Sequence, residues 1–254
     1  MTGLALIFVV LRVISRFWIM RNPGMDDVLL ILSTVVLCGF LASLAVSVHN
    51  HAGYPSVTLD AGNIEALSKT ALLVEILYYF NICFIKCSIL LTYLRFAVTR
   101  IFRRLCKGTI YFHVFLCIGS VVAVFSQTDP LSKMWTAAGD LNDYRINLAV
   151  LFYVTAGINI ATDFWILVLP IKALSQIRRP RGEKIVLFCV FGAGLFASVA
   201  SIVRLRSIAI YVNAEDHLRN SLSLLLWCMI EMSVAICCAS VTGMRPIWLW
   251  IIRQ

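Results

Sequence analysis

The sequence predicts an all-α protein, a polytopic membrane helix bundle of seven transmembrane helices with the N-terminus outside and the C-terminus in the cytoplasm. Three observations support this fold class. Of the 254 residues, 61% are apolar, which leaves too few polar side chains to cover a water-soluble fold of this size. The apolar residues fall in stretches of about 20, the length that crosses a bilayer as a helix. The basic residues gather at alternate ends of these stretches.

Six stretches are apolar enough over sufficient length to be predicted as spans: 28–48, 70–94, 109–127, 147–170, 185–212 and 220–243. A seventh, 2–20, is predicted as a short first span, because Arg12 and Arg16 interrupt it. Each arginine would cost about 2.5–3.5 kcal/mol at mid-membrane, so we expect both side chains to reach the inner surface. The connections are too short for another domain, and residues 1–254 are predicted to form one seven-helix membrane domain.

Lysine and arginine are unevenly distributed between alternate connections. One side carries fifteen, in the first connection, the 95–107 and 171–184 loops and the tail, and the other carries four. The positive-inside rule places the richer side in the cytoplasm, and a plasma membrane is favoured over an internal one. Because topology explains the excess of 22 Lys and Arg over 13 Asp and Glu, no nucleic-acid partner is expected. The expected partners are the lipid bilayer and a cytoplasmic effector at the basic loops.

Cysteine and histidine provide two candidate metal-binding pairs. Cys83 and Cys87 share a helix face, and His49 and His51 lie at the outer mouth between two spans. Each pair needs a further ligand, so membrane packing is favoured for the thiols and solvation for the imidazoles. All nine cysteines lie within spans or on the cytoplasmic side, where thiols stay reduced. We predict no metal and no cofactor.

Ionisable residues inside predicted spans are functional candidates, because burying a charge in hydrocarbon is costly without a partner. There are six: Glu75, Lys86, Asp163, Arg204, Arg206 and Glu231. At 1.5 Å per residue, Glu75 and Arg204 both lie about 30 Å from the inner surface, whereas Lys86 and Asp163 lie about 13 and 10 Å from it. We therefore predict two ion pairs, Glu75 with Arg204 and Lys86 with Asp163.

Uncharged polar residues are expected to support these pairs. Asn81, Ser88 and Asn159 lie in the same spans, and Asn159 shares a helix face with Asp163. Glu231 lies near mid-membrane with no cation at its depth, which makes it the strongest candidate for a ligand contact or a proton site. A purely structural role, holding the helices together, is the alternative for all six ionisable residues.

An ordered set of short motifs runs through nearly the whole chain. It comprises Met25-Asp26-Asp27, Glu75, Lys86-Cys87-Ser88-Ile89-Leu90, Tyr93-Leu94-Arg95, Asn159-Ile160-Ala161-Thr162-Asp163, Leu169-Pro170-Ile171, Ala200-Ser201-Ile202-Val203-Arg204, Trp227 with Glu231, and Arg245-Pro246. With these motifs the chain resembles the fungal rhodopsin-like integral membrane domain, a family that includes Pth11-like receptors and the membrane proteins of the satratoxin biosynthesis cluster. The resemblance implies a seven-helix fold. Together with the intramembrane charges, it gives a predicted binding cluster of Glu75, Asn81, Lys86, Asn159, Asp163, Arg204, Trp227 and Glu231.

The chain departs from the family pattern in two places. The family often carries a cysteine in a Phe-Gln-Cys-x-Pro string after the fourth span and another in the following loop, whereas Gln127-Thr128-Asp129-Pro130 and the loop to Arg145 contain none. An external disulfide and the rigid outer lid it would support are therefore not expected. The first span is also shorter than the family pattern.

Four functions are compatible with a fold of this kind: retinal binding, sensing, catalysis and transport. Retinal binding requires a lysine in the last helix, and none lies between Arg219 and Gln254. The resemblance implies instead a receptor-like sensor, without retinal, of an external small apolar molecule or surface cue. The alternative is a membrane-embedded, cyclase-like enzyme of secondary metabolism that uses a buried carboxyl as general acid. Transport is less favoured, because neither a broken helix nor an internal repeat is evident.

Overall fold

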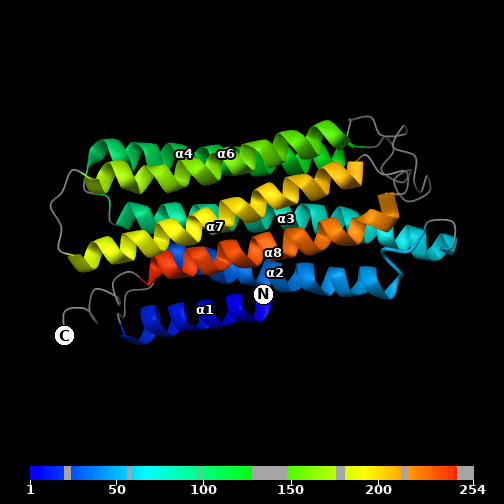
Figure 1. Cartoon of the computed structure of the whole chain (residues 1–254), viewed down its shortest axis with the longest axis horizontal. Coiled ribbons are helices and arrows are strands. Elements are labelled where there is room, and N and C mark those ends of the chain that lie inside the picture. Colours follow the sequence, from blue (N-terminus) through cyan, green and yellow to red (C-terminus); the bar gives the residue numbers. More distant parts are fainter. Residues whose placement is uncertain are drawn as a thin grey trace.

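The computed structural model describes residues 1–19, 24–55, 59–95, 97, 99–127, 148–175, 181–212 and 217–244. Over these residues the predicted all-α class is confirmed, and seven α-helices run side by side in an elongated bundle (Figure 1). They are α1 (Thr2–Ile14), α2 (Met25–His49), α3 (Ala61–Arg95), α4 (Arg100–Phe125), α6 (Leu148–Ser175), α7 (Arg181–Val212) and α8 (His217–Gly243). A π-helical turn, η1 (Ser15–Ile19), continues α1.

Six of these helices, α2 to α8, are long and apolar enough to cross a membrane, and they coincide with the six longer predicted spans. The seventh, α1, has 13 residues. A helix of that length rises about 20 Å, less than the roughly 30 Å of a hydrocarbon core. The protein is therefore a multi-pass membrane protein with six candidate spans and one shorter helix over the described residues.

Two helices begin nine residues earlier than predicted. α3 starts at Ala61 and α4 at Arg100, whereas the apolar pattern began at 70 and 109. Hydropathy marks only the part of a helix that suits lipid, so it misses turns that extend beyond the membrane. Thr99 caps α4 by accepting a hydrogen bond from the backbone N–H of Phe102 over 3.3 Å. Residues predicted as part of a basic loop thus form the first turns of a helix.

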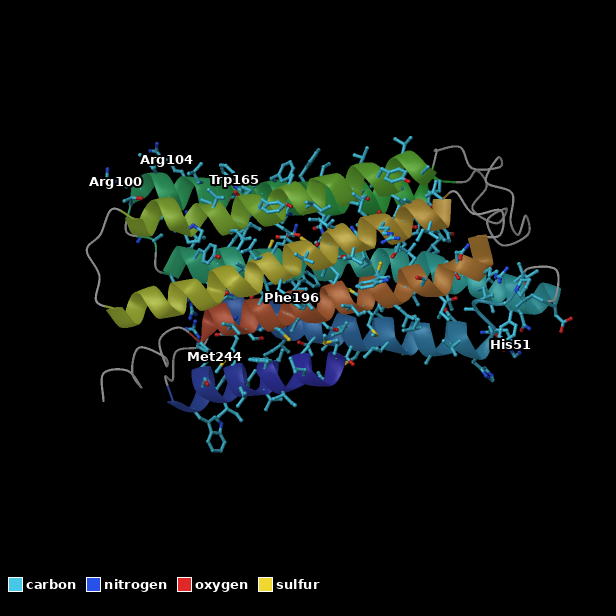
Figure 2. All side chains as sticks on the ribbon, in the orientation of Figure 1. His51, Arg100, Arg104, Trp165, Phe196 and Met244 are labelled. Atoms are coloured by element: carbon cyan, nitrogen blue, oxygen red, sulfur yellow. The ribbon has the colours of Figure 1, made fainter. Side chains whose placement is uncertain are left out.

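The basic residues mark one end of the bundle. Figure 2 shows Arg100, Arg104 and Met244 toward one end and His51 at the other. We call the first the basic end; α3 ends and α4 begins there (Figure 1). The clustering follows the predicted alternation of charge along the chain. Which end faces the cytoplasm stays a prediction from that charge bias.

α3 and α8 form the centre of the bundle. α3 packs against α2, α4 and α8, and α8 also packs against α1, α2 and α7. Their buried apolar side chains include Ile85, Met232 and Ile236, which are at most 1% exposed. This central position lets polar residues on α3 and α8 meet partners from most of the other helices.

The expectation that Arg12 and Arg16 reach the surface is wrong. Arg12 is 1% exposed and Arg16 is 4% exposed. Arg12 lies 2.8 Å from Asp27 Oδ1 and 2.9 Å from Asp26 Oδ2, and its Nη1 donates to Ala239 O over 2.6 Å. The carboxylates that open α2 compensate the arginine charge inside the protein, so the side chain has no need to reach water.

Asp26 also binds α3. Arg95 Nε lies 3.0 Å from Asp26 Oδ1, and the Ser88 hydroxyl donates to the backbone oxygen of Asp26 over 2.6 Å. Ser88 was predicted to support the Lys86–Asp163 pair. That prediction is wrong, because Ser88 bonds Asp26 instead. This charged cluster joins α1, α2, α3 and α8 close to the basic end.

Candidate functional site

The predicted ion pair between Lys86 of α3 and Asp163 of α6 is present. Lys86 Nζ lies 2.9 Å from Asp163 Oδ1, and Lys86 is only 4% exposed. The ammonium group also donates to Asn159 O over 3.0 Å and to Thr162 Oγ1 over 2.7 Å. Asn159, Thr162 and Asp163 follow one another at i, i+3 and i+4, so one face of α6 supplies every oxygen that surrounds the lysine.

The predicted pairing of Glu75 with Arg204 is wrong, because Arg204 of α7 pairs with Glu231 of α8. Arg204 Nε lies 2.8 Å from Glu231 Oε2, and its guanidinium carbon lies 4.6 Å from the centre of the Tyr78 ring. Matching depths did not predict this pair, because a depth does not tell which way a helix face is turned. The statement that Glu231 lacks a cation is corrected by the same contact.

Glu75 instead interacts with an amide. Gln127, two residues beyond α4, places its Nε2 3.2 Å from each carboxylate oxygen of Glu75. The Tyr79 hydroxyl lies 3.5 Å from Oε1. Glu75 thus belongs to a separate polar group of α3 and the end of α4.

Glu231 accepts donors at both of its oxygens. Oε1 accepts from Asn159 Nδ2 over 2.9 Å and from Ser201 Oγ over 2.5 Å. Oε2 accepts from the Tyr78 hydroxyl over 3.0 Å and lies beside Arg204. Three side chains therefore donate hydrogen bonds to Glu231, and the charge of Arg204 lies beside them.

Ser201 connects the two ion pairs. Its hydroxyl lies 2.5 Å from Glu231 Oε1 and 3.1 Å from Asp163 Oδ2. A hydroxyl has one proton to donate, so it bonds fully to one carboxylate at a time. The Lys86–Asp163 pair and the Arg204–Glu231 pair are therefore linked through a single rotatable side chain on α7.

These groups line a cavity between α3, α6, α7 and α8, which we call the ion-pair cavity. Its space, including the opening, is about 610 Å³, of which about 50 Å³ can hold the centre of a water molecule. A single water needs roughly 10–15 Å³ by that measure, so the cavity has room for a few waters or a narrow ligand. Its polar side chains are Lys86, Asn159, Asp163, Ser201, Glu231 and Thr242 with Tyr93, among mostly apolar neighbours.

The other members of the predicted cluster lie elsewhere. Asn81 is fully buried and accepts from Ser33 Oγ of α2 over 2.6 Å. Trp227 is half-buried and is not among the side chains that line the ion-pair cavity. Arg206 is exposed. Of the eight predicted binding residues, the cavity thus brings together Lys86, Asn159, Asp163 and Glu231, with Arg204 behind Glu231.

Sequence reasoning missed Tyr78, Thr162 and Ser201. Each is uncharged, and no cost of burial distinguishes such residues from the many hydroxyls that bond their own helix backbone. Ser201 precedes Arg204 by three residues, and Thr162 precedes Asp163 by one. This closeness in sequence to a charged residue could have identified both as candidate site residues. Tyr78 gave a weaker one, as a polar aromatic three residues after Glu75.

The two candidate metal-binding pairs have different surroundings. Cys83 and Cys87 pack together with Cys117 of α4 in a buried cluster. The His51 ring packs edge-on against Tyr54, with the ring centres 5.6 Å apart. Over the ranges that the structure describes, no group of three or more His, Cys, Asp or Glu side chains is arranged to hold a metal ion.

Comparison with known proteins gives one family and two relatives. The model of the family described as "Fungal rhodopsin domain" matches residues 11–250. A "SAT4 family membrane protein" of Emericella nidulans is 27% identical over 197 residues, which cover 74% of this chain and 46% of that protein. "Receptor GIN3" of Arthrobotrys oligospora is 26% identical over 179 residues, which cover 70% of this chain and 43% of the receptor. The match thus covers less than half the length of each relative, and no solved structure matches the chain.

Proposed function

We propose that this chain, which belongs to the fungal rhodopsin domain family, is a receptor-like membrane protein that binds a small, neutral, largely apolar molecule in the ion-pair cavity. A matched relative is named a receptor, which supports this class of function. The observation that carries the proposal is the linkage of two buried ion pairs through Ser201 at a cavity wall.

The charge balance of the site favours a neutral ligand. Lys86 and Arg204 contribute two positive charges, and Asp163 and Glu231 contribute two negative charges. Because each ion is compensated by a protein partner, a charged ligand would have to be desolvated without gaining a counter-ion. A molecule with an apolar body and one or two hydrogen-bonding groups fits the mixed lining better.

The Ser201 hydroxyl has two possible arrangements, because it can donate its hydrogen bond either to Asp163 or to Glu231. A ligand that contacts Asp163 or the cavity face of Ser201 favours donation to one carboxylate over the other, and this changes how firmly α7 is held to α6 and to α8. A ligand shifts such an equilibrium only through its different affinity for the two arrangements. The lining reaches Thr242, one residue before the end of α8, so a shift there reaches the basic end, where an effector is expected.

The surroundings of the Glu231 and Asp163 carboxylates support the enzyme alternative less well than the receptor proposal. Three protein donors and the Arg204 guanidinium surround Glu231, and Asp163 is held by Lys86 and Ser201. Both carboxylates are thus already engaged by protein partners, whereas a general acid must deliver its proton to the substrate. Retinal chemistry is also unsupported, since α8 contains no lysine. The proposed location is the plasma membrane with the basic end in the cytoplasm.

Three fungal strains test this function: a deletion, Ala197→Phe and Val199→Phe. Ala197 lines the ion-pair cavity, so a phenyl group there fills it while the ion pairs remain intact. Val199 is 53% exposed on the same helix, so the same substitution there faces lipid and is the matched control. Transcription after surface contact or nutrient shift, and the metabolite profile, are measured in each strain.

A receptor predicts that the deletion and Ala197→Phe lose the transcriptional response, while Val199→Phe keeps it and metabolites before the stimulus are unchanged. Accumulation of a biosynthetic precursor in both the deletion and Ala197→Phe, with the response intact, would establish the enzyme alternative instead.

A further inference from the structure

A second cavity lies between α3, α4 and α6. Its lining includes Tyr79 and Cys83 of α3, His113 and Cys117 of α4, and Thr155 and Asn159 of α6. The space, including the opening, is about 370 Å³, of which about 30 Å³ can hold the centre of a water molecule. Asn159 and Ile82 line both this space and the ion-pair cavity, so the two are separated by a shared wall.

Two buried polar atoms from the lining of this second cavity have no hydrogen-bond partner among the residues that the structure describes. They are His113 Nε2 and Asn159 Oδ1, on residues that are 2% and 7% exposed. Exchanging the oxygen and nitrogen of the Asn159 amide would not give the unpaired oxygen a partner. The Glu231 carboxylate accepts from Nδ2 and requires a donor at that position. Buried polar atoms are nearly always paired, so these two call for a partner from outside the chain.

The lining limits the chemistry of that partner. Among the described residues, no Asp, Glu, Lys or Arg lines the second cavity; its polar groups are an imidazole, an amide, two thiols and hydroxyls among apolar side chains. An ion would find no counter-charge, whereas a hydroxyl can donate to Asn159 Oδ1 or exchange a hydrogen bond with His113 Nε2. A neutral alcohol can therefore provide the missing hydrogen-bond partner for Asn159 Oδ1 and His113 Nε2.

The position of the cavity indicates a route from the lipid. α4 packs extensively on α3 but only sparsely on α6. The Trp165 indole donates to Thr109 Oγ1 over 3.1 Å, which ties α6 to α4 nearer the basic end than His113 (Trp165 is labelled in Figure 2). On the outer face of α4, Phe112 is 45% exposed and Phe115 is 77% exposed, as expected for a lipid-facing surface. A chain-like tail therefore has apolar surface to follow along this seam.

We propose that the second cavity binds the hydroxyl head of a lipid-soluble alcohol, whose apolar tail lies in the seam between α4 and α6. The hydroxyl pairs with Asn159 Oδ1 and His113 Nε2, and the tail stays in contact with lipid. Such an alcohol would reach Asn159 from the side opposite to the ion-pair cavity. This binding does not depend on the proposed receptor function.

The test uses the whole protein in phosphatidylcholine nanodiscs with a photoactivatable octanol, followed by peptide mass spectrometry. We expect labelling to concentrate at Leu116, Cys117 and Thr155, and we expect unlabelled octanol to compete for it while octane does not. His113→Leu should reduce this labelling several-fold. Phe112→Leu, the neighbouring lipid-facing position, is the matched control and should leave it unchanged.

Labelling spread evenly over lipid-exposed residues, or equal competition by octane, would overturn the proposal, because either means that the hydroxyl is not recognised. Absence of labelling at the cavity would overturn it as well, since water alone would then fill the space. The competition between octanol and octane uses the unaltered chain, so the test does not depend on the folding of His113→Leu. The labelling experiment measures binding and not signalling. Its result is therefore independent of the test of the proposed function.

Discussion

Arg204 of α7 and Glu231 of α8 lie 2.8 Å apart, with side chains that are only 6% and 3% exposed. One turn before Arg204 on α7, Ser201 bonds the same carboxylate. Two successive helices are thus joined through one acidic group that also receives Asn159 from α6 and Tyr78 from α3. Glu231 is the point at which four helices meet.

The first prediction concerns which carboxylate Arg204 depends on. In a double-mutant cycle on the free energy of unfolding in mixed micelles, Arg204→Gln and Glu231→Gln should be strongly non-additive, with a coupling of about 1–3 kcal/mol. The same cycle with Arg204→Gln and Glu75→Gln should show a smaller coupling, because Glu75 is bonded to Gln127 and Tyr79. A larger coupling to Glu75 would mean that the pairing described here is incorrect.

The second prediction concerns Lys86 and Asp163. Lys86→Met leaves the half-buried Asp163 carboxylate without its counter-ion and should lower the free energy of unfolding by about 2–4 kcal/mol. The double variant Lys86→Met with Asp163→Leu should be more stable than Lys86→Met alone, since no charge is then left unpaired. The exposed pair Lys69–Glu65 is the control, and Lys69→Met should cost at most about 0.5 kcal/mol. Equal stability of the single and double variants would contradict the account.

The third prediction concerns the attachment of α1. Arg12→Gln removes the ion pairs to Asp26 and Asp27 and should destabilise the protein by about 3–5 kcal/mol, with faster proteolysis near the α1–α2 connection. Arg104→Gln changes an exposed side chain toward the same end and should shift stability by less than about 0.5 kcal/mol. Equal effects of both substitutions would mean that the buried cluster does not hold α1.

The fourth prediction uses a glycine beside the same cluster. A Cβ at Gly243 would overlap the Arg12 guanidinium, so Gly243→Ala should destabilise the protein by about 1–3 kcal/mol. A Cβ at Gly119 would meet nothing within 4 Å, so Gly119→Ala in α4 should be neutral or stabilise by up to about 1 kcal/mol. Thermal unfolding of the two purified variants makes the comparison, and a neutral Gly243→Ala would show that Arg12 is not fixed in this position.

The parts of this fold that follow from apolar length could be predicted from sequence. The six longer helices coincide with the predicted spans, because roughly 20 apolar residues have few alternatives to a membrane helix. The first turns of α3 and α4 could not be found in that way, since a helix beyond the membrane needs no apolar residues. The burial of Arg12 was missed for a different reason: its cost was assessed without the nearby carboxylates of Asp26 and Asp27.

The sequence identified the charged residues of the candidate site better than it identified which side chains interact with one another. Lys86 and Asp163 were paired correctly, because they agree in depth and their helix faces meet. Glu75 and Arg204 agree in depth as well, but rotation of their helices turns Arg204 toward Glu231. Ser201, which links the pairs, carries no charge and left no comparable signal. The rotation of each helix about its own axis, set by packing, was the missing information.

Binding in the ion-pair cavity is tested most directly by thermal stabilisation of the purified protein with a library of neutral, lipid-soluble small molecules. The account predicts at least one compound that raises the Tm of the unaltered chain and of Val199→Phe by several degrees but leaves that of Ala197→Phe unchanged. Compounds that stabilise Ala197→Phe as much as the unaltered chain would show that they bind elsewhere, and would contradict the assignment of this cavity as the ligand site.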